Sequence, residues 1–125
     1  MNHFERKLLK IKENLYSNQQ NKGVKQFFQS SILHFAICLE VGIGTLNNKY
    51  VSYEKLCETI PKKFGSRSTI QSILNDAVNE KYFLKSVSPT DKRIKSYILS
   101  DEFTNLLQDW VKFHEDVMSV NYEAA

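Results

Sequence analysis

Two short segments rich in β-forming residues, 83–88 and 94–99, constrain the fold of this chain more than any other feature of its sequence. They flank the sequence Pro89-Thr90-Asp91-Lys92-Arg93. Proline and aspartate favour reverse turns, and two β-rich segments joined by such a turn form a hairpin. The sequence therefore predicts a β-hairpin with a charged tip.

Two helical segments precede the predicted hairpin. A short strand at Tyr50-Val51 leads to Ser52, which is a preferred N-cap residue for a helix over 53–60. The sequence Pro-Lys-Lys-Phe-Gly at 61–65 interrupts the chain, and Ser66 or Ser68 then caps a helix that runs to about residue 82. A short helix, a turn, a second helix and a hairpin form the layout of a winged helix-turn-helix, so we predict a mainly α (α+β) fold.

Helices are also predicted at both ends of the chain. Phe4, Leu8, Ile11 and Leu15 are separated by steps of four, three and four residues, which is the spacing of one apolar helical stripe. A last helix begins at Ser100, and acidic residues follow in its first turn, where the helix dipole favours them. Its apolar face comprises Phe103, Leu106, Leu107, Trp110, Val111, His114 and Val117.

A central helix is predicted from about Val24 to Val41, after a polar turn at Ser17–Gly23. This helix is apolar on most sides, which is typical of a buried helix. Gly42 and Gly44 are predicted to end it.

The amphipathic helices at the two ends exceed what a winged domain needs, because such a domain is complete in about 70–80 residues. We therefore predict one winged-helix domain over 1–125, with the helix-turn-helix and hairpin in 50–99 and dimerisation helices in 1–22 and 100–120. The predicted homodimer interface comprises Phe4, Leu8, Ile11, Leu15, Phe103, Leu107, Trp110 and Val117.

The net charge of +3 is the sum of segments with opposite charge. Residues 1–48 hold six basic and three acidic residues (+3), residues 49–95 hold ten and five (+5), and residues 96–125 hold one and six (−5). A basic middle segment favours an anionic partner, and an acidic end would keep a dimer body away from nucleic acid. The simpler alternative for the basic residues is a solvated surface, and lysines at a hairpin tip also protect an exposed edge.

The helix that begins at Ser66 or Ser68 has two chemically different faces. At about 100° per residue, its apolar side chains share one face, while hydroxyl and amide side chains occupy the opposite face near its N-terminus. Glutamine and asparagine can pair with adenine in the major groove, and recognition helices present their N-terminal turns to base edges. The pattern favours contact with double-stranded DNA over a plain solvated face, which more often carries lysine and glutamate.

Basic residues before this helix and at the hairpin tip would contact phosphate, which supplies affinity while base contacts supply specificity. The predicted DNA-binding residues are Lys62, Lys63, Ser66, Arg67, Ser68, Gln71, Ser72, Asn75, Lys92, Arg93 and Lys95.

The sequence Ser66-Arg67-Ser68-Thr69-Ile70-Gln71-Ser72-Ile73-Leu74, followed by Tyr82-Phe83-Leu84-Lys85, resembles the recognition helix and first wing strand of MarR-type transcriptional regulators. Pro89-Thr90-Asp91-Lys92-Arg93 resembles the wing of that family, which carries an Asp-x-Arg pair at its tip. The resemblance implies that Arg93 reaches the minor groove or its edge, that Asp91 helps to hold Arg93, and that a homodimer reads a pseudo-palindrome. The chain departs from the family at Lys81, where glycine is common, at Pro89, where an arginine is common, and in its longer turn at 61–65.

The same resemblance implies a small aromatic effector, bound between the dimer body and the winged domain. The candidate pocket residues are His34, Phe35 and Cys38.

Enzymatic and metal-dependent functions find little support in the residues. Cys38 and Cys57 lack metal-ligand spacing, and no nucleophile–base or paired-carboxylate set can be assembled, so no enzyme, metal or cofactor is predicted. The longest uncharged apolar run, 30–39, is too short to span a bilayer, and no signal peptide is recognisable, which predicts a cytoplasmic protein without a membrane partner.

Two alternatives to a regulator stay open: a winged helix that binds another protein, and a replication or partition initiator.

Overall fold

The computed structural model describes the backbone of residues 2–16 and 27–124 and the side chains of residues 2–16 and 27–116. Helices α1 (His3–Tyr16) and α3 (Ile32–Leu46) are followed by strand β1 (Val51–Ser52), helix α4 (Tyr53–Thr59), the short 3-10 helix η1 (Lys62–Phe64) and helix α5 (Arg67–Asn79). Strands β2 (Phe83–Val87) and β3 (Lys95–Leu99) and helix α6 (Asp101–Ala124) complete the order. The predicted helix, turn, helix and hairpin are confirmed, whereas the turn predicted at 17–23 lies outside the described residues.

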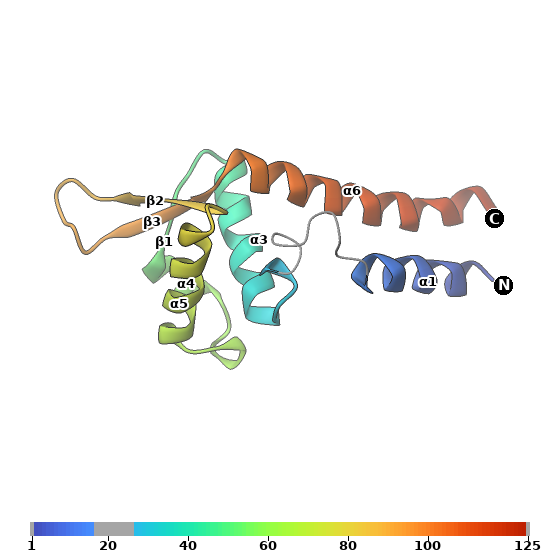
Figure 1. The fold of residues 1–125 in the computed structure, drawn as a ribbon, viewed down its shortest axis with the longest axis horizontal. Coiled ribbons are helices and arrows are strands. Elements are labelled where there is room, and N and C mark those ends of the chain that lie inside the picture. Colours follow the sequence, from blue (N-terminus) through green and yellow to red (C-terminus); the bar gives the residue numbers. More distant parts are fainter. Residues whose placement is uncertain (1, 17–26, 125) are drawn as a thin grey trace.

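The hairpin and the terminal helices lie at opposite ends of the molecule (Figure 1). The β2–β3 hairpin projects from a body that contains α3, α4 and α5. On the other side α6 leaves the body, and α1 runs beside α6 (Figure 1). Within the described residues, the structure holds no helix with the length and apolar character needed to span a membrane.

Three antiparallel strands in the order β1-β3-β2 join the hairpin to the body. Phe83 pairs with Leu99 at the base of the hairpin, and Val51 pairs with Tyr97 on the other edge of β3. Phe83, Tyr97 and Leu99 are buried, whereas the residues of β2 beyond Phe83 are exposed. The base of the hairpin is therefore fixed by the core, and its tip extends into solvent.

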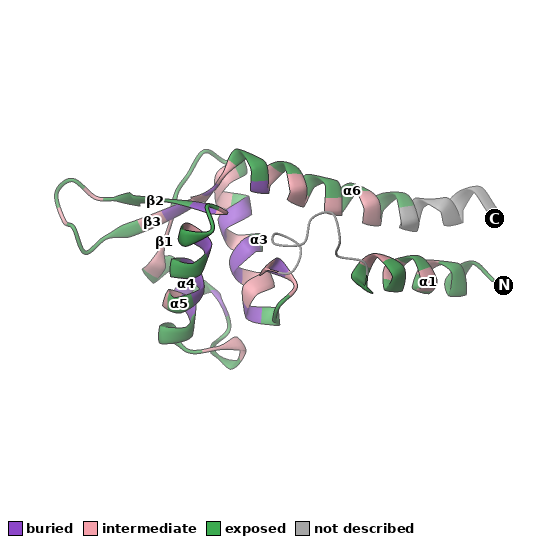
Figure 2. Cartoon of the chain, in the orientation of Figure 1, coloured by how far each residue is buried: buried purple, intermediate pink, exposed green. Residues whose placement is uncertain are grey.

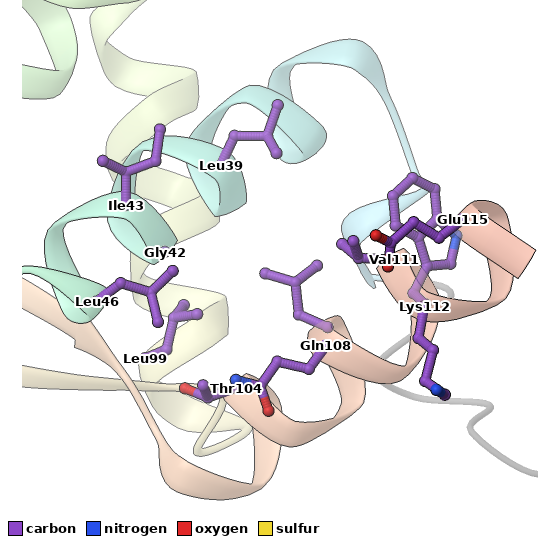
Figure 3. A pocket seen from close by; sticks show the side chains of 12 residues that line it. Leu39, Gly42, Ile43, Leu46, Leu99, Thr104, Gln108, Val111, Lys112 and Glu115 are labelled. Atoms are coloured by element: carbon purple, nitrogen blue, oxygen red, sulfur yellow. The ribbon is translucent and has the colours of Figure 1, made fainter. Parts of the chain in front are cut away.

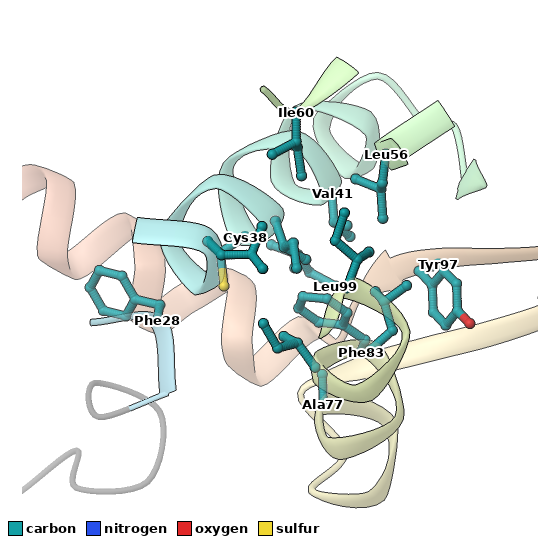
Figure 4. Close-up of a cluster of buried hydrophobic side chains, with 14 of the residues drawn as sticks. Phe28, Cys38, Val41, Leu56, Ile60, Ala77, Phe83, Tyr97 and Leu99 are labelled. Carbon is teal, nitrogen blue, oxygen red and sulfur yellow. The ribbon is translucent and has the colours of Figure 1, made fainter. Parts of the chain in front are cut away.

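The core lies where α3, α4, α5, the base of the hairpin and the start of α6 meet (Figure 4). Buried residues line the inner sides of these elements, while α1 and the hairpin tip carry no buried residue (Figure 2). The largest fully buried side chains are Tyr97, Phe83, Phe103, Ile37, Leu56, Leu74, Val41 and Cys38.

The central helix differs from its prediction at both ends. A break at 29–31 separates it from the helical residues 27–28, and the hydroxyl of Ser31 caps α3 by accepting a hydrogen bond from the His34 N–H at 3.1 Å. The helix then continues through both glycines to Leu46. At Gly44, a Cβ would lie 2.8 Å from the Lys49 carbonyl oxygen and would collide with the Val51 side chain. Gly44 therefore permits close packing against the following turn and strand rather than ending the helix.

Helix α5 begins as predicted and ends earlier. Of the two candidate caps, Ser66 is the N-cap, because its hydroxyl accepts a hydrogen bond from the Thr69 N–H at 3.2 Å. The helix stops at Asn79 rather than near 82. Lys81 takes a positive φ of 65°, and the Tyr82 N–H donates to the Ala77 carbonyl at 2.9 Å. Helices often end in this way, with a glycine in the left-handed conformation. Here Lys81 takes that conformation, which strains the backbone of a residue that has a Cβ.

Candidate nucleic-acid interface

Helix α5 presents one buried and one exposed face. Ile70, Ile73, Leu74 and Ala77 are buried in the core. On the opposite side Ser68, Ser72 and Asn75 are exposed, and Gln71 is half-buried. The exposed face near the N-terminus of α5 therefore consists of hydroxyl and amide groups and is open to solvent.

Two amide side chains on this face are linked to each other. The Gln71 Nε2 donates a hydrogen bond to the Asn75 Oδ1 at 3.0 Å, one helical turn further along. This bond leaves one acceptor oxygen on Gln71 and one donor nitrogen on Asn75. A donor and an acceptor held side by side match the N7 and N6 groups of adenine in the major groove.

The hydroxyl of Ser66 is occupied within the helix start. Besides accepting from the Thr69 N–H, its Oγ lies 3.0 Å from the Ser68 Oγ and 2.9 Å from the Thr69 Oγ1. From the sequence, Ser66 was predicted both to cap the helix and to contact DNA. The structure confirms the cap, and the DNA contact stays a prediction.

Arg67, the first residue of α5, is paired with helix α4. Its Nη2 donates to the Glu54 Oε1 at 2.5 Å, and its Cζ lies 5.4 Å from the centre of the Tyr53 ring. The hydrogen bond to Glu54 raises the pKa of Arg67 further above its already high ordinary value. Arg67 is therefore not a free cation at the start of the helix.

The hairpin tip holds a second ion pair. Arg93 donates to Asp91 through its Nε, its Nη2 and its backbone N–H, each at 3.0 Å. The side-chain bond from Arg93, followed by the backbone bond, lowers the pKa of Asp91 and keeps it ionised. The Arg93 side chain is 91% exposed, so the pair lies on the surface of the tip.

The remaining predicted phosphate contacts are exposed lysines. Lys62 and Lys63 lie on η1, Lys92 lies in the hairpin turn and Lys95 begins β3. In the part of the chain that the structure describes, none of these four has a carboxylate within 4.0 Å. The lysines, rather than the arginines, therefore supply the unpaired positive charge beside α5 and at the tip.

The three candidate effector residues lie on α3 and pack into the fold. His34 Nδ1 lies 2.7 Å from the Ser31 Oγ, and burial lowers the pKa of His34 against the opposing effect of Asp76. Phe35 packs against the Trp110 ring at 5.6 Å. Cys38 is 1% exposed, and burial raises the pKa of its thiol, so it offers no surface to a ligand.

A groove of about 510 Å³ lies between α3 and the first half of α6 (Figure 3). None of the three predicted pocket residues lines it. Exposed apolar side chains from both helices form its walls, and polar side chains of α6 form its rim. The lining residues are Leu39, Gly42, Ile43, Leu46, Leu99, Thr104, Leu107, Gln108, Trp110, Val111, Lys112 and Glu115.

The predicted dimer residues divide into an exposed and a buried group. Phe4, Leu8 and Leu15 on α1 are 69%, 51% and 52% exposed, and Ile11 is half-buried. Phe103 was wrongly assigned to the interface, because its ring is 1% exposed inside the core of its own chain. The helical periodicity that placed it on the apolar face of α6 cannot distinguish a core from an interface.

Three predicted interface residues lie further along α6. Leu107 and Trp110 are partly buried and pack against the core of their own chain. The side chain of Val117 lies outside the described residues.

Two features of the site were not anticipated from the sequence. One is the contact of Tyr53 and Glu54 with Arg67, and the other is the groove between α3 and α6. Both join residues that are distant in the sequence, so no local pattern could reveal them. Among the described residues, no group of three or more His, Cys, Asp or Glu side chains could hold a metal ion.

Solved structures share this architecture. A variant of ZitR from Lactococcus lactis is 16% identical, with 97% of this chain and 77% of that chain covered at a TM-score of 0.59. The heme sensor protein PefR from Streptococcus agalactiae, in complex with heme, is 18% identical, with 88% and 76% covered at a TM-score of 0.56. No family model and no curated protein matches the sequence.

These similarities, together with the order of elements, establish the architecture. The chain has the winged helix-turn-helix fold. In this fold α4 and α5 form the helix-turn-helix, and the β2–β3 hairpin is the wing.

Proposed function

We propose that this chain is a sequence-specific DNA-binding transcriptional regulator of the MarR type, acting in the cytoplasm as a homodimer. In this proposal α5 lies in the major groove, and the wing contacts the backbone or the minor groove. The observation that carries the proposal is the exposed hydroxyl–amide face of α5. The amide side chains of Gln71 and Asn75 on this face can form hydrogen bonds with base edges. Exposed lysines on η1 and in the hairpin can contact phosphate.

The distribution of charge supports this orientation. The segment 49–95, which contains α4, α5 and the wing, carries a formal charge of +5, and the segment 96–125 carries −5. The wing and the free ends of α1 and α6 lie at opposite ends of the molecule (Figure 1). A DNA duplex would attract the first region and repel the second.

Homodimerisation is proposed through α1 and α6. Phe4, Leu8 and Leu15 lie exposed along α1, although α1 runs beside α6. Helices in proteins gain most of their stability from packing of an apolar face. Helix α1 has an apolar stripe but no buried residue, so a second chain could supply this packing. The α1 helix contains four basic residues (Arg6, Lys7, Lys10 and Lys12) against two acids (Glu5 and Glu13), and α6 is acidic, so opposite charges would favour pairing of the two helices.

The test of the proposed function is selection of bound genomic DNA fragments by the full chain at two salt concentrations. A shared palindrome whose binding weakens steeply with salt is expected for a dimeric regulator. Direct repeats would instead indicate an initiator. Absence of salt-dependent DNA binding would contradict the proposal and favour the protein-binding alternative.

Arg93→Ala is expected to weaken DNA binding and to reduce the slope of log K against log salt by up to about one, less any cation uptake by the freed Asp91 carboxylate. The physical reason is the loss of one phosphate-neutralising charge at the wing tip. Binding titrations at several salt concentrations measure the slope. Lys112→Ala, which removes one positive charge from α6, is the control and should leave the slope unchanged. Equal effects of the two substitutions would show that net charge, and not the wing, determines binding.

A small aromatic carboxylic acid is proposed as the effector, and the groove between α3 and α6 replaces the predicted pocket as its site. The volume of about 510 Å³ lies in the usual range for ligand pockets. Its leucine, isoleucine and valine walls suit an aromatic ring, and the rim contains both the cation of Lys112 and the carboxylate of Glu115, of which only Lys112 would attract the acid.

Binding of such an acid should change the fluorescence of Trp110, the only tryptophan in the chain and a lining residue of the groove. We expect a saturable change on titration with benzoate-type acids. Lys112→Ala should weaken the apparent affinity several-fold, about the effect of one exposed charge pair. An apparent affinity that is the same in Lys112→Ala as in the parent chain would contradict the proposed contact between Lys112 and the carboxylate of the ligand.

A further inference from the structure

Two neighbouring side chains of α4 hold the first residue of α5. The Arg67 guanidinium donates to Glu54 at 2.5 Å and lies over the Tyr53 ring at 5.4 Å. The Tyr53 hydroxyl donates to the Arg67 carbonyl oxygen at 3.1 Å. The backbone of Arg67 is therefore fixed by Tyr53, while its charge is paired with Glu54.

The ion pair is open to water and can exchange partners. The side chains of Arg67 and Glu54 are 59% and 65% exposed. An exposed pair contributes little to stability, because water screens the charges and two long side chains lose freedom. A guanidinium can instead form two parallel hydrogen bonds to a phosphate, and helix N-termini favour anions. Arg67 has both features, since it begins α5.

We propose that Glu54 competes with DNA phosphate for Arg67 and thereby limits the affinity of this chain for DNA. This inference rests on the proposed function, because it requires α5 to face DNA. In the free protein Arg67 is neutralised by Glu54. In the complex Arg67 turns to a phosphate, and the carboxylate of Glu54 is left unpaired beside the DNA backbone.

The exchange has a consequence for the salt dependence of binding. Neutralising one phosphate releases about 0.9 counterion from duplex DNA. When Arg67 leaves Glu54, the freed carboxylate attracts a cation from solution, and this uptake offsets the release. Arg67 should therefore contribute little to the salt slope while Glu54 is present, and close to one unit when Glu54 is neutral.

The second ion pair of the site differs in its hydrogen bonds. Asp91 receives a backbone N–H from Arg93 in addition to two guanidinium bonds. If the guanidinium moved to DNA, the Asp91 carboxylate would lose its paired charge as Glu54 would, but it would keep that backbone hydrogen bond. Among the described residues, Glu54 has only the Arg67 guanidinium as a hydrogen-bond partner. The competition is therefore assigned to Glu54.

The first experiment measures DNA binding by the full chain carrying Glu54→Gln, over a series of salt concentrations. We expect about two- to fivefold tighter binding, the effect of one exposed charge pair, and a salt slope steeper by up to about one. Glu58→Gln is the matched control, because Glu58 is exposed on the same helix one turn later and has no ion pair in the described part of the chain. It removes the same charge and should change the slope much less.

The second experiment places Arg67→Gln in both backgrounds. In the parent chain we expect a small loss of affinity and little change in slope. In the Glu54→Gln background we expect Arg67→Gln to abolish the gain in affinity and the steeper slope. This pair of measurements forms a double-mutant cycle that isolates the coupling between the two residues. Unfolding midpoints of the four proteins, measured in urea, establish that the compared proteins are folded.

Several outcomes would overturn the inference while the proposed function stands. If the parent chain binds DNA and Glu54→Gln behaves like Glu58→Gln, only the general charge matters. If Glu54→Gln weakens binding, Glu54 orients Arg67 for its contact instead of competing for it. If Arg67→Gln has the same effect in both backgrounds, the two residues are not coupled on DNA. Failure of the parent chain to bind DNA at any salt concentration would instead contradict the proposed function itself.

Discussion

Phe103→Ala is expected to lower the free energy of unfolding by about 3–5 kcal/mol, the usual loss when a buried phenylalanine ring is removed. Phe103 is 1% exposed, and its ring centre lies 5.4 Å from that of Tyr82 and 5.9 Å from that of Phe83. Because these contacts lie within one chain, the loss should not depend on protein concentration. Urea unfolding followed by circular dichroism at several concentrations measures it.

Leu8→Ala is the comparison from the proposed dimer interface. Leu8 is 51% exposed, and α1 has no buried residue, so we expect the free energy of unfolding of a single chain to change by less than about 0.5 kcal/mol. The dissociation constant of the homodimer should instead increase, which sedimentation velocity over a dilution series can measure. A concentration-dependent effect of Phe103→Ala would place Phe103 in an interface between chains. An unaltered dimer in Leu8→Ala would show that Leu8 lies outside the dimer interface.

Gln71→Ala is expected to reduce discrimination between the preferred base pair and its alternatives by about 1–3 kcal/mol at one position of the operator. Gln71 donates to Asn75 at 3.0 Å, so the substitution removes one reading group and releases the other. Competition binding against operators substituted at each position measures the loss. The loss should be confined to one or two neighbouring base pairs, whereas removal of a phosphate contact weakens binding to all sequences.

Asn79→Ala is the matched control for this substitution. Asn79 is an exposed amide in the last turn of α5, away from the N-terminal turns that recognition helices present to bases. We expect the Asn79→Ala variant to prefer the same operator sequence as the parent chain, to the same extent. A uniform loss of affinity in Gln71→Ala, or a matching change of preference in Asn79→Ala, would contradict the assignment of base reading to Gln71.

The local signals in the sequence predicted the elements well where the deciding residues are neighbours. Ser52 caps α4 by accepting from the Lys55 N–H, and the turn at 89–93 joins β2 to β3. Capping and turn formation depend on groups within about four residues, so the sequence pattern contains the physical cause. The face of α5 could be derived in the same way from its helical period.

The sequence-based predictions were wrong at three places, two of which involve contacts between residues distant in the sequence. Gly44 was predicted to end the helix, but α3 continues to Leu46. The absence of a Cβ at Gly44 leaves space for the Val51 side chain and the Lys49 carbonyl oxygen. Lys81 is unfavourable in a left-handed conformation, yet it closes α5. Phe103 reads as an interface residue and lies in the core. For Gly44 and Phe103, contacts with residues distant in the sequence decided the outcome, whereas the left-handed conformation of Lys81 belongs to the local closure between Ala77 and Tyr82.

The candidate interface shows the same division. Residue types and their spacing identified the exposed amide face of α5 and the basic residues around it. Only the folded chain showed that Arg67 is paired with Glu54, thirteen residues earlier, and that Lys62, Lys63, Lys92 and Lys95 have no carboxylate within 4.0 Å in the described part of the chain. Helical and strand periodicity are properties of consecutive residues, so the amino-acid order was enough to define the elements and the chemistry of their faces. Which charges are neutralised, which rings are buried and where a groove opens depend on how those faces meet, and tertiary packing alone decided them.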